Sequence, residues 1–173
     1  MKKVMLFAGL IGVLLTSCAE DTGITNEDRA TNETDRMFTM QVAMGNRAEI
    51  MAGQLAAQKG TNTGVKSYGQ LMVDHHTTAQ AQLKTIAANA GLPAPDSVSM
   101  EHQMLMQRLN SLTGYSFDTA YINSQVRDHQ KTLSIFQMEV NSGRNPAVRN
   151  FATQNIGMIQ MHYNMADSIR RRL

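Results

Sequence analysis

Apolar residues recur at three- and four-residue spacing along most of this chain, and glycine or proline interrupts the pattern at only a few places. Such spacing puts apolar side chains on one face of an α-helix. The interruptions fall at Gly60, Gly91-Leu92-Pro93, Gly114 and Gly143, and Asn145-Pro146 pairs a capping residue with proline at a first helical position. The sequence therefore predicts helices over residues 34–59, 62–90, 96–113, 116–142 and 146–170.

Four of these segments are long and have narrow apolar faces, which favours a four-helix bundle. The chain has 173 residues, enough for one ordinary domain. Between the second and fourth segments lies a helix of about 16 residues, which spans about 25 Å and can carry the chain back along the bundle. We therefore expect an all-α, ferritin-like bundle in up-down-down-up order with a short crossover helix. Asp96 and Ser116 are the expected caps of the third and fourth helices.

The N-terminus has the features of an export signal. Lys2 and Lys3 precede an uncharged apolar run, Val4–Leu15, which is too short to span a bilayer as a helix. The run ends in Leu15-Thr16-Ser17-Cys18, which resembles the lipobox of bacterial lipoproteins, whose cysteine is lipidated and becomes the first mature residue. Cys18 is the only cysteine of the chain. We expect a signal peptide over 1–17, lipidated Cys18 with a flexible polar tether over 18–33, and a bundle domain over 34–173.

The alternative is a plain secretory signal followed by an incidental cysteine. Ala19 rather than aspartate follows Cys18, and in enteric-type sorting this favours the outer membrane. We therefore expect an exported lipoprotein whose membrane partner is the bilayer that holds its anchor, with the domain in the periplasm. Removing the signal takes away Lys2 and Lys3, which leaves basic and acidic residues equal in number. A domain with no net charge is not expected to bind nucleic acid.

Polar residues on the predicted inner faces, one on each long helix, fall at similar heights in the ferritin-like order. Their offsets from the helix ends differ by about three residues, or about 5 Å of rise. These residues are Glu49, His75, His129 and His162. One hypothesis is a mononuclear site for zinc, iron or copper. The other is a hydrogen-bonded polar layer, supported by Tyr121, Gln125 and His76.

Two other metal chemistries can be compared with the same residues. A di-iron oxidase is not expected, because the glutamate that should stand three residues before each histidine is replaced by Met72, Val126 and Ile159. Copper handling is a further hypothesis, because thioethers bind Cu(I) and copper is handled in the periplasm. Most methionines also lie on core faces, where packing alone explains them. The copper ligands would be Met158, Met161, Met165 and His162.

Several stretches form one ordered pattern over about residues 36–169. They are Ala48-Glu49-Ile50 with Leu55-Ala56, Val65–Gly69 before Met72–His75, Leu109–Gly114 before Phe117–Tyr121, His129 with Phe136 and Glu139, and Phe151-Ala152 before His162. The pattern resembles domain-of-unknown-function family 4142, bacterial proteins often described as predicted outer membrane proteins and grouped with ferritin-like folds. The resemblance implies an exported ferritin-like bundle and supplies no activity. It supports Glu49, His75, Tyr121, His129 and His162 as motif positions, favours His75 over His76, and departs at Gly157, where the family often has proline.

No catalytic motif stands out in the sequence, so the first functional hypothesis is a non-enzymatic, lipid-anchored bundle. Such a protein would serve as a binding or envelope-maintenance module of unknown ligand. The second hypothesis is a metal protein that holds one transition-metal ion and acts as a sensor, a store or a simple oxidoreductase.

Overall fold

The computed structural model describes residues 30–173, so the expected signal peptide, Cys18 and most of the tether lie outside the described residues. Within that range no strand is present, and none of the helices is long and apolar enough to cross a membrane. The all-α prediction is therefore confirmed. The helices are α1 (Glu33–Lys59), α2 (Thr63–Ala90), α3 (Met100–Ser111), α4 (Gly114–Ser142) and α5 (Pro146–Arg170).

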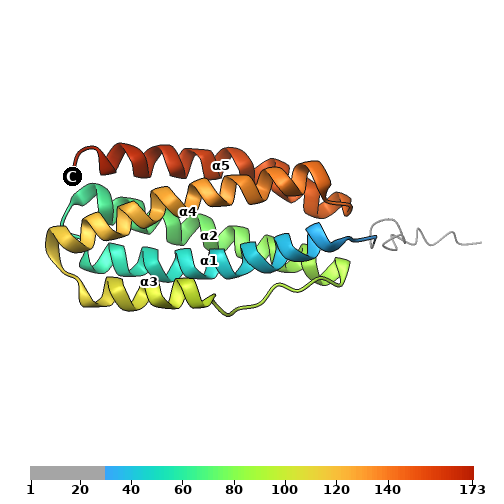
Figure 1. Ribbon diagram of the computed structural model, residues 1–173, viewed down its shortest axis with the longest axis horizontal. Coiled ribbons are helices and arrows are strands. Elements are labelled where there is room, and N and C mark those ends of the chain that lie inside the picture. Colours follow the sequence, from blue (N-terminus) through green and yellow to red (C-terminus); the bar gives the residue numbers. More distant parts are fainter. Residues whose placement is uncertain (1–29) are drawn as a thin grey trace, which may run out of the picture.

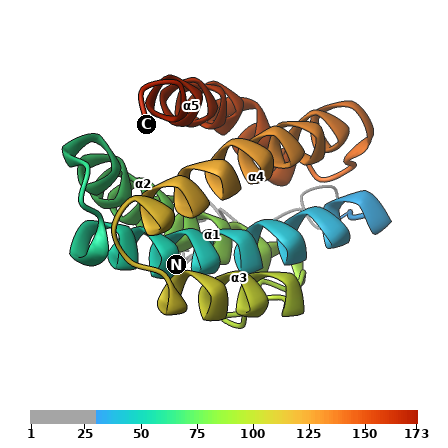
Figure 2. The ribbon, with the colours of Figure 1, turned by 60° about the vertical axis from the view of Figure 1, so that its left-hand side comes forward.

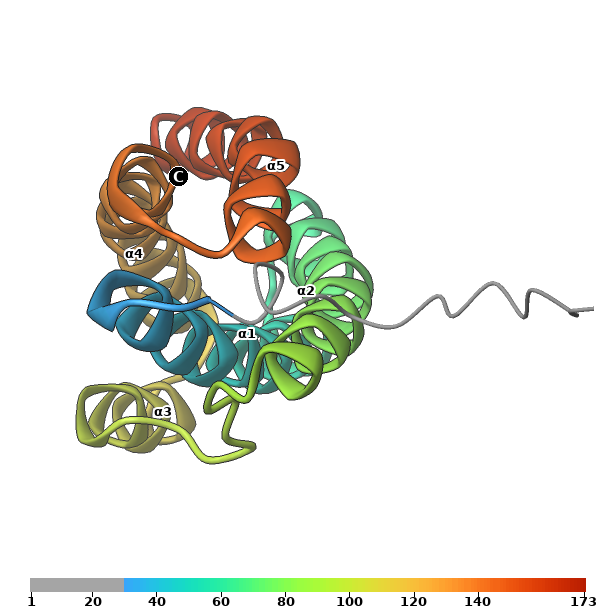
Figure 3. The same cartoon turned by 90° about the vertical axis from the view of Figure 1, so that its right-hand side faces the viewer.

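The four long helices lie side by side, and α3 packs on the outside of the bundle beside α1 (Figures 1 and 3). In Figure 1, α1 and α5 run from right to left, whereas α2 and α4 run from left to right. Segment 91–99 and α3 carry the chain back between α2 and α4 (Figure 2). This is the predicted up-down-down-up order with one crossover, the order of ferritin-like bundles.

The crossover helix starts later than the sequence predicts. Ser99 rather than Asp96 caps α3, because its hydroxyl accepts a hydrogen bond from the backbone N–H of His102. Asp96 instead pairs with the ammonium group of Lys84 on α2. The fourth helix starts earlier than predicted, at Gly114, whose φ of 59° is a conformation that glycine adopts without strain.

Two buried aspartates connect the α1–α2 hairpin to the α4–α5 hairpin. Asp118, in the first turns of α4, accepts a hydrogen bond of 2.8 Å from the backbone N–H of Asn62, in the turn between α1 and α2. Asp35, in the first turn of α1, accepts one of 3.0 Å from the backbone N–H of Asn145, in the turn between α4 and α5. The separation in sequence between Asp35 and Asp118 equals that between Asn62 and Asn145, so the two contacts occupy corresponding positions in the two hairpins. The contacts fix the register of the helices along the bundle axis.

The backbones of α1 and α2 touch at two glycines. A Cβ atom at Gly53 would lie 2.6 Å from the carbonyl oxygen of Gly69, and one at Gly69 would lie 2.7 Å from the carbonyl oxygen of Gly53. Both separations are too short for a carbon atom, so only glycine fits this crossing. Asn46 and His76 lie seven residues from these glycines, about two turns along the same face of each helix. The crossing therefore decides which side of α2 faces α1.

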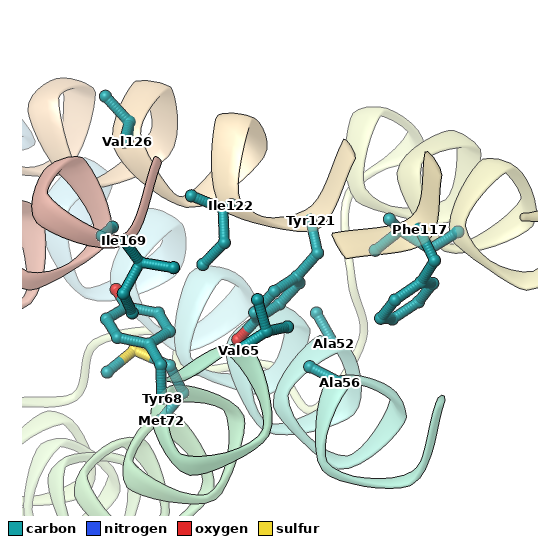
Figure 4. Packing of buried hydrophobic residues seen from close by; sticks show 12 residues of the cluster. Ala52, Ala56, Val65, Tyr68, Met72, Phe117, Tyr121, Ile122, Val126 and Ile169 are labelled. Carbon is teal, nitrogen blue, oxygen red and sulfur yellow. The ribbon is translucent and has the colours of Figure 1, made fainter. Parts of the chain in front are cut away.

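The core consists of two apolar clusters, one toward each end of the bundle. In the first, Phe117 and Tyr121 of α4 pack with Tyr68 and with smaller residues of α1, α2 and α5 (Figure 4). The second is built around aromatic rings, and the centroids of Phe38 and Phe136 are 5.0 Å apart in an edge-to-face contact. Such clusters supply most of the free energy of folding.

A polar layer separates the two clusters on all four long helices. On α2, for example, His76 lies between Met72 of the first cluster and Ala79 of the second. Corresponding positions on the other helices are also polar. The layer contains Asn46 and Glu49 of α1, His75 and His76 of α2, His129 of α4 and His162 of α5.

Candidate metal centre

Three buried histidines from three helices meet in the polar layer. The exposed fractions of His76 on α2, His129 on α4 and His162 on α5 are 3%, 2% and 0%. Nitrogen atoms, one from each ring, all lie within 4.8 Å of one another, and the ring centroids are separated by 5.9, 5.4 and 5.3 Å. The rings are close enough to hold one metal ion, whose bonds to nitrogen are about 2 Å long.

Hydrogen bonds fix the tautomers of two of these rings. Nδ1 of His76 is 2.8 Å from the side-chain oxygen of Asn46, and Nδ1 of His129 is 2.9 Å from the backbone carbonyl of Gln125. A carbonyl oxygen can only accept, so each ring donates from Nδ1 and keeps a lone pair on Nε2. Histidines that bind metals usually have such a partner on their other nitrogen.

The third ring, His162, is oriented by a fourth histidine. Its Nε2 is 2.8 Å from Nδ1 of His75, and the two rings stack with centroids 5.1 Å apart. When His162 donates in this contact, its lone pair is on Nδ1. In the described part of the chain, Nε2 of His76, Nε2 of His129 and Nδ1 of His162 are buried without a hydrogen-bond partner. Leaving buried polar atoms unpaired is costly, and a cation would satisfy all three.

Burial keeps the three imidazoles in the neutral form. It lowers the pKa of His129 to about 4, against the raising effects of the Gln125 carbonyl and of Asp128. Burial, with smaller effects of His129 and His75, lowers the pKa of His162 to about 3. Burial and then the neighbouring histidines hold the pKa of His76 well below its usual value. Neutral imidazole is the form that coordinates metals, so at neutral pH no proton has to leave.

Glu49 lies in the same layer but outside the group of three histidines. Its Oε2 accepts a hydrogen bond of 2.9 Å from the side-chain amide of Gln125. Loss of water around the carboxyl group raises the pKa of Glu49 to about 7, against the lowering effect of this hydrogen bond. Gln125 therefore connects the carboxyl group of Glu49 with His129, because the backbone carbonyl of Gln125 accepts from that ring.

A cavity of about 270 Å³ leads from the polar layer toward the surface. Its inner wall includes His76, His129 and Glu49, whereas Glu101 and Lys131 line it at the exposed surfaces of α3 and α4. The amine of Lys131 is 3.2 Å from a carboxylate oxygen of Glu101. The cavity therefore extends to two of the three histidines, whose Nε2 atoms themselves are buried.

The histidine set differs from the predicted one at one position. The structure brings His129 and His162 together with His76, which the sequence assigned to the supporting layer, and it places His75 behind His162. Adjacent residues on a helix point about 100° apart, so one of the two neighbours on α2 faces the centre and the other does not. The glycine crossing is the signal that could have identified His76, because Gly69 lies two turns away on the same face.

The other predicted support residues have separate roles. Tyr121 is fully buried, contacts the Tyr68 ring edge-to-face at 6.2 Å and stacks on Phe117. Its hydroxyl group has no hydrogen-bond partner within residues 30–173, and burial, with Glu49 and Tyr68, raises the pKa of Tyr121 well above its usual value. Tyr121 therefore belongs to the aromatic cluster, whereas Gln125 bridges Glu49 and His129.

The residues of the copper hypothesis are divided between core and surface. His162 is completely buried, whereas Met161 and Met165 are 39% and 37% exposed. Met158 is partly buried and packs against the second apolar cluster. Helix α5 continues through Gly157 from Pro146 to Arg170, so the departure from the family pattern does not interrupt the helix near His162.

Comparison with known proteins identifies the family and supports the fold. The crystal structure of a DUF305 fragment from Deinococcus radiodurans is similar, with a TM-score of 0.71 and 14% sequence identity, over 83% of this chain and 99% of that chain. At this identity the likeness shows the fold alone. No curated protein matches significantly. A family model described as a domain of unknown function, DUF4142, matches residues 21–169, so this protein belongs to the DUF4142 family, as its motifs predicted.

Proposed function

We propose that this protein binds one transition-metal ion through His76, His129 and His162. The observation that carries the proposal is the set of three buried ring nitrogens, one per histidine, that have no hydrogen-bond partner among the described residues. Three lone pairs in a buried layer lack a donor among the described residues, and one divalent ion would replace all the missing donors. Neutral imidazole is a ligand of Zn²⁺, Fe²⁺ and Cu²⁺.

The competing hypothesis is a layer that satisfies itself through hydrogen bonds. Several contacts fit it, since Gln125 donates to Glu49 and His75 contacts His162. A self-contained layer would also pair the remaining buried nitrogens, because native cores leave few polar atoms unpaired. The three ring nitrogens do not follow that rule, and neither do the Tyr121 hydroxyl and Oε1 of Gln125. Among the described residues, only the three histidines also bring one ligand atom each within 4.8 Å of one another, and this favours metal binding.

We place this site in the bacterial envelope, on a domain anchored to the outer membrane through lipidated Cys18 and facing the periplasm. The lipobox and the single cysteine support this location, and attached acyl chains anchor a protein stably. Replacing Cys18 by alanine should abolish labelling by palmitate and release the protein from the membrane fraction. Wild-type protein that incorporates no palmitate would contradict the anchor and leave the metal proposal intact.

Metal analysis of the protein purified in detergent without a His tag tests the site. Elemental analysis should find about one transition-metal ion per chain, as expected for one three-nitrogen site. After removal by a chelator, calorimetry with Zn²⁺ or Co²⁺ should show the same stoichiometry. Bound metal should also raise the melting temperature, because a ligand of the folded state stabilises that state.

Two histidine variants distinguish metal binding at the three-histidine site from metal binding by other histidines of the protein. His129→Ala should weaken metal binding at least about 100-fold, because a ligand is lost. His102→Ala is the matched control, since His102 on α3 bonds Ser99 and lies outside the group of three. Circular dichroism should show that both variants are folded. Equal affinity of wild type and His129→Ala, or no binding by the metal-free wild type, would contradict the proposal.

A further inference from the structure

We propose that the bound metal ion keeps one coordination position open toward the cavity and binds a small exogenous anion there. This inference rests on the proposed metal site. Among residues 30–173, no cysteine, aspartate or glutamate joins the group formed by His76, His129 and His162. Ions such as Zn²⁺ take four ligands, and sites with three protein ligands complete the set with water or a solute.

The arrangement of the rings directs this position toward the cavity. His76 and His129 lie in the cavity wall, whereas His162 does not. Their Nδ1 atoms are occupied by Asn46 and Gln125, so Nε2 is the nitrogen that each offers to a metal. Both Nε2 atoms are buried, so an ion held by them would lie just inside the cavity wall, with His162 on the side away from the cavity.

The size of the cavity limits the ligand to small molecules. The volume is about 270 Å³, whereas a water molecule takes about 30 Å³ of liquid. At that volume per molecule there is space for up to about nine waters, or for an anion of three or four heavy atoms with water around it. The volume lies just below the range of pockets for drug-sized ligands, about 300–1,000 Å³. Azide, thiocyanate and short carboxylates are of the right size.

Charge favours an anion over a neutral ligand. Three imidazoles contribute no charge, so a divalent ion would keep both of its positive charges in a buried layer. The charged groups in the outer wall compensate one another, because Lys131 pairs with Glu101 and Asp128 with Arg127. Glu49 is the one acidic group in the inner wall, and Gln125 holds it.

A glycine in the cavity wall makes it possible to narrow the path of the anion to the metal without changing a histidine that would bind the metal. A Cβ atom at Gly45 of α1 would meet no atom within 4 Å, and Gly45 lines the cavity. Phenylalanine at this position would take up part of the space. Gly157 on α5 is the matched control, because its Cβ position is equally free and it lies outside this cavity.

The test uses purified protein loaded with one equivalent of Co²⁺, whose visible spectrum reports the ligands of the metal. Titration with azide should change the spectrum and saturate at one anion per metal. Gly45→Phe should bind Co²⁺ like the wild type and lower the apparent azide affinity at least about tenfold, or about 1.4 kcal/mol. Gly157→Phe should behave like the wild type in both measurements.

The possible outcomes distinguish a failure of this inference from a failure of the proposed metal site. Co²⁺ that binds but does not respond to azide would overturn the open position and indicate a closed site; a response that appears only in Glu49→Gln would identify Glu49 as the closing ligand. Equal azide affinity in Gly45→Phe and wild type would contradict the inference that azide reaches the metal through this cavity. Protein that binds no Co²⁺ would contradict the proposed function instead.

Discussion

Each histidine of the centre is held by a different acceptor or partner. A side-chain amide orients His76, a backbone carbonyl orients His129, and a second imidazole orients His162. The first two contacts fix which ring nitrogen carries a proton, and therefore which nitrogen can bind a metal, and the third orients the His162 ring. The chemistry of the layer depends on these outer partners as much as on the three histidines.

Replacing Asn46 by alanine should weaken metal binding by about 10–100-fold. His76 would lose the oxygen that accepts from its Nδ1, so neither its tautomer nor its ring orientation would be fixed. Asn46→Asp is the control, because it keeps an acceptor at the same place. Competition against a chromophoric chelator measures both affinities. Asn46→Ala with wild-type affinity would show that this contact does not orient a ligand.

Glu139 on α4 makes the stability of the protein depend on pH. Burial, followed by the neighbouring carboxylate of Asp35, raises the pKa of Glu139 from 4.5 to about 8. Between these values the folded state holds a proton that the unfolded state releases. The contribution of Glu139 to stability is therefore present at low pH and is lost as the pH rises toward about 8.

Glu139→Gln should remove this pH dependence, because glutamine does not ionise. The free energy of unfolding of the variant, relative to wild type, should rise between about pH 5 and about pH 8 by on the order of a few kcal/mol. Urea denaturation at several pH values measures the difference. Parallel stability curves for the two proteins would mean that Glu139 is not protonated in the folded state.

Helices α1 and α2 are positioned by backbone contact as well as by apolar side chains. The contact between Gly53 and Gly69 presses one face of α2 against α1, and the same face carries His76 two turns later. The rotation of α2 about its own axis thus determines which histidine enters the centre. The contact between Gly53 and Gly69 therefore affects both the packing of α2 on α1 and the choice of the histidine that joins the candidate site.

Gly69→Ala should destabilise the fold by about 1–3 kcal/mol, because the added methyl group overlaps the opposite backbone. Metal affinity should fall as well, since α2 must shift and move His76. Gly157→Ala is the control, and it should stabilise the protein by about 0.5–1 kcal/mol, because its Cβ meets no neighbour. Chemical denaturation and metal titration would test both effects. A neutral Gly69→Ala would disprove the tight contact.

The four long helices form two hairpins, α1–α2 and α4–α5. Each hairpin has a buried aspartate that bonds the turn of the other hairpin, whereas the residues of the polar layer differ between the two. Asp35 and Asp118 occupy corresponding positions, because each accepts a hydrogen bond from the turn of the other hairpin. The separation in sequence between Asp35 and Asp118 is the same as that between Asn46 and His129. At that offset, Ile159 corresponds to His76. The common features build the bundle, and the differences between the hairpins leave three histidines, among the described residues, close enough to hold a metal ion.

Asp118→Ala should reduce the stability of the whole molecule by about 2–4 kcal/mol, because the backbone N–H groups of Thr61 and Asn62 would lose their buried, charged acceptor. Asp96→Ala should cost less than about 1 kcal/mol, because the ion pair between Asp96 and Lys84 is exposed. Thermal or urea unfolding compares the two. Similar losses in both variants would show that Asp118 does not clamp the hairpins.

The sequence by itself determined the helices, their order in the bundle and the height of the polar layer. Helix breaks at residues such as Gly91 and Gly143 are local, and a helix rises about 1.5 Å per residue whatever its neighbours are. Positions along the bundle axis can therefore be counted from the turns. Counting was sufficient to put Glu49, His129 and His162 into one layer.

Only the tertiary structure decided how each helix is turned about its axis. It groups His76 rather than His75 with the other two histidines, it pairs Glu49 with Gln125, and it places a cavity next to two of the three histidines. Rotation depends on contacts between residues far apart in sequence, such as Gly53 with Gly69, and neighbouring positions differ by about 100°. Heights along the bundle follow from local geometry, whereas the direction in which a side chain points is decided by packing.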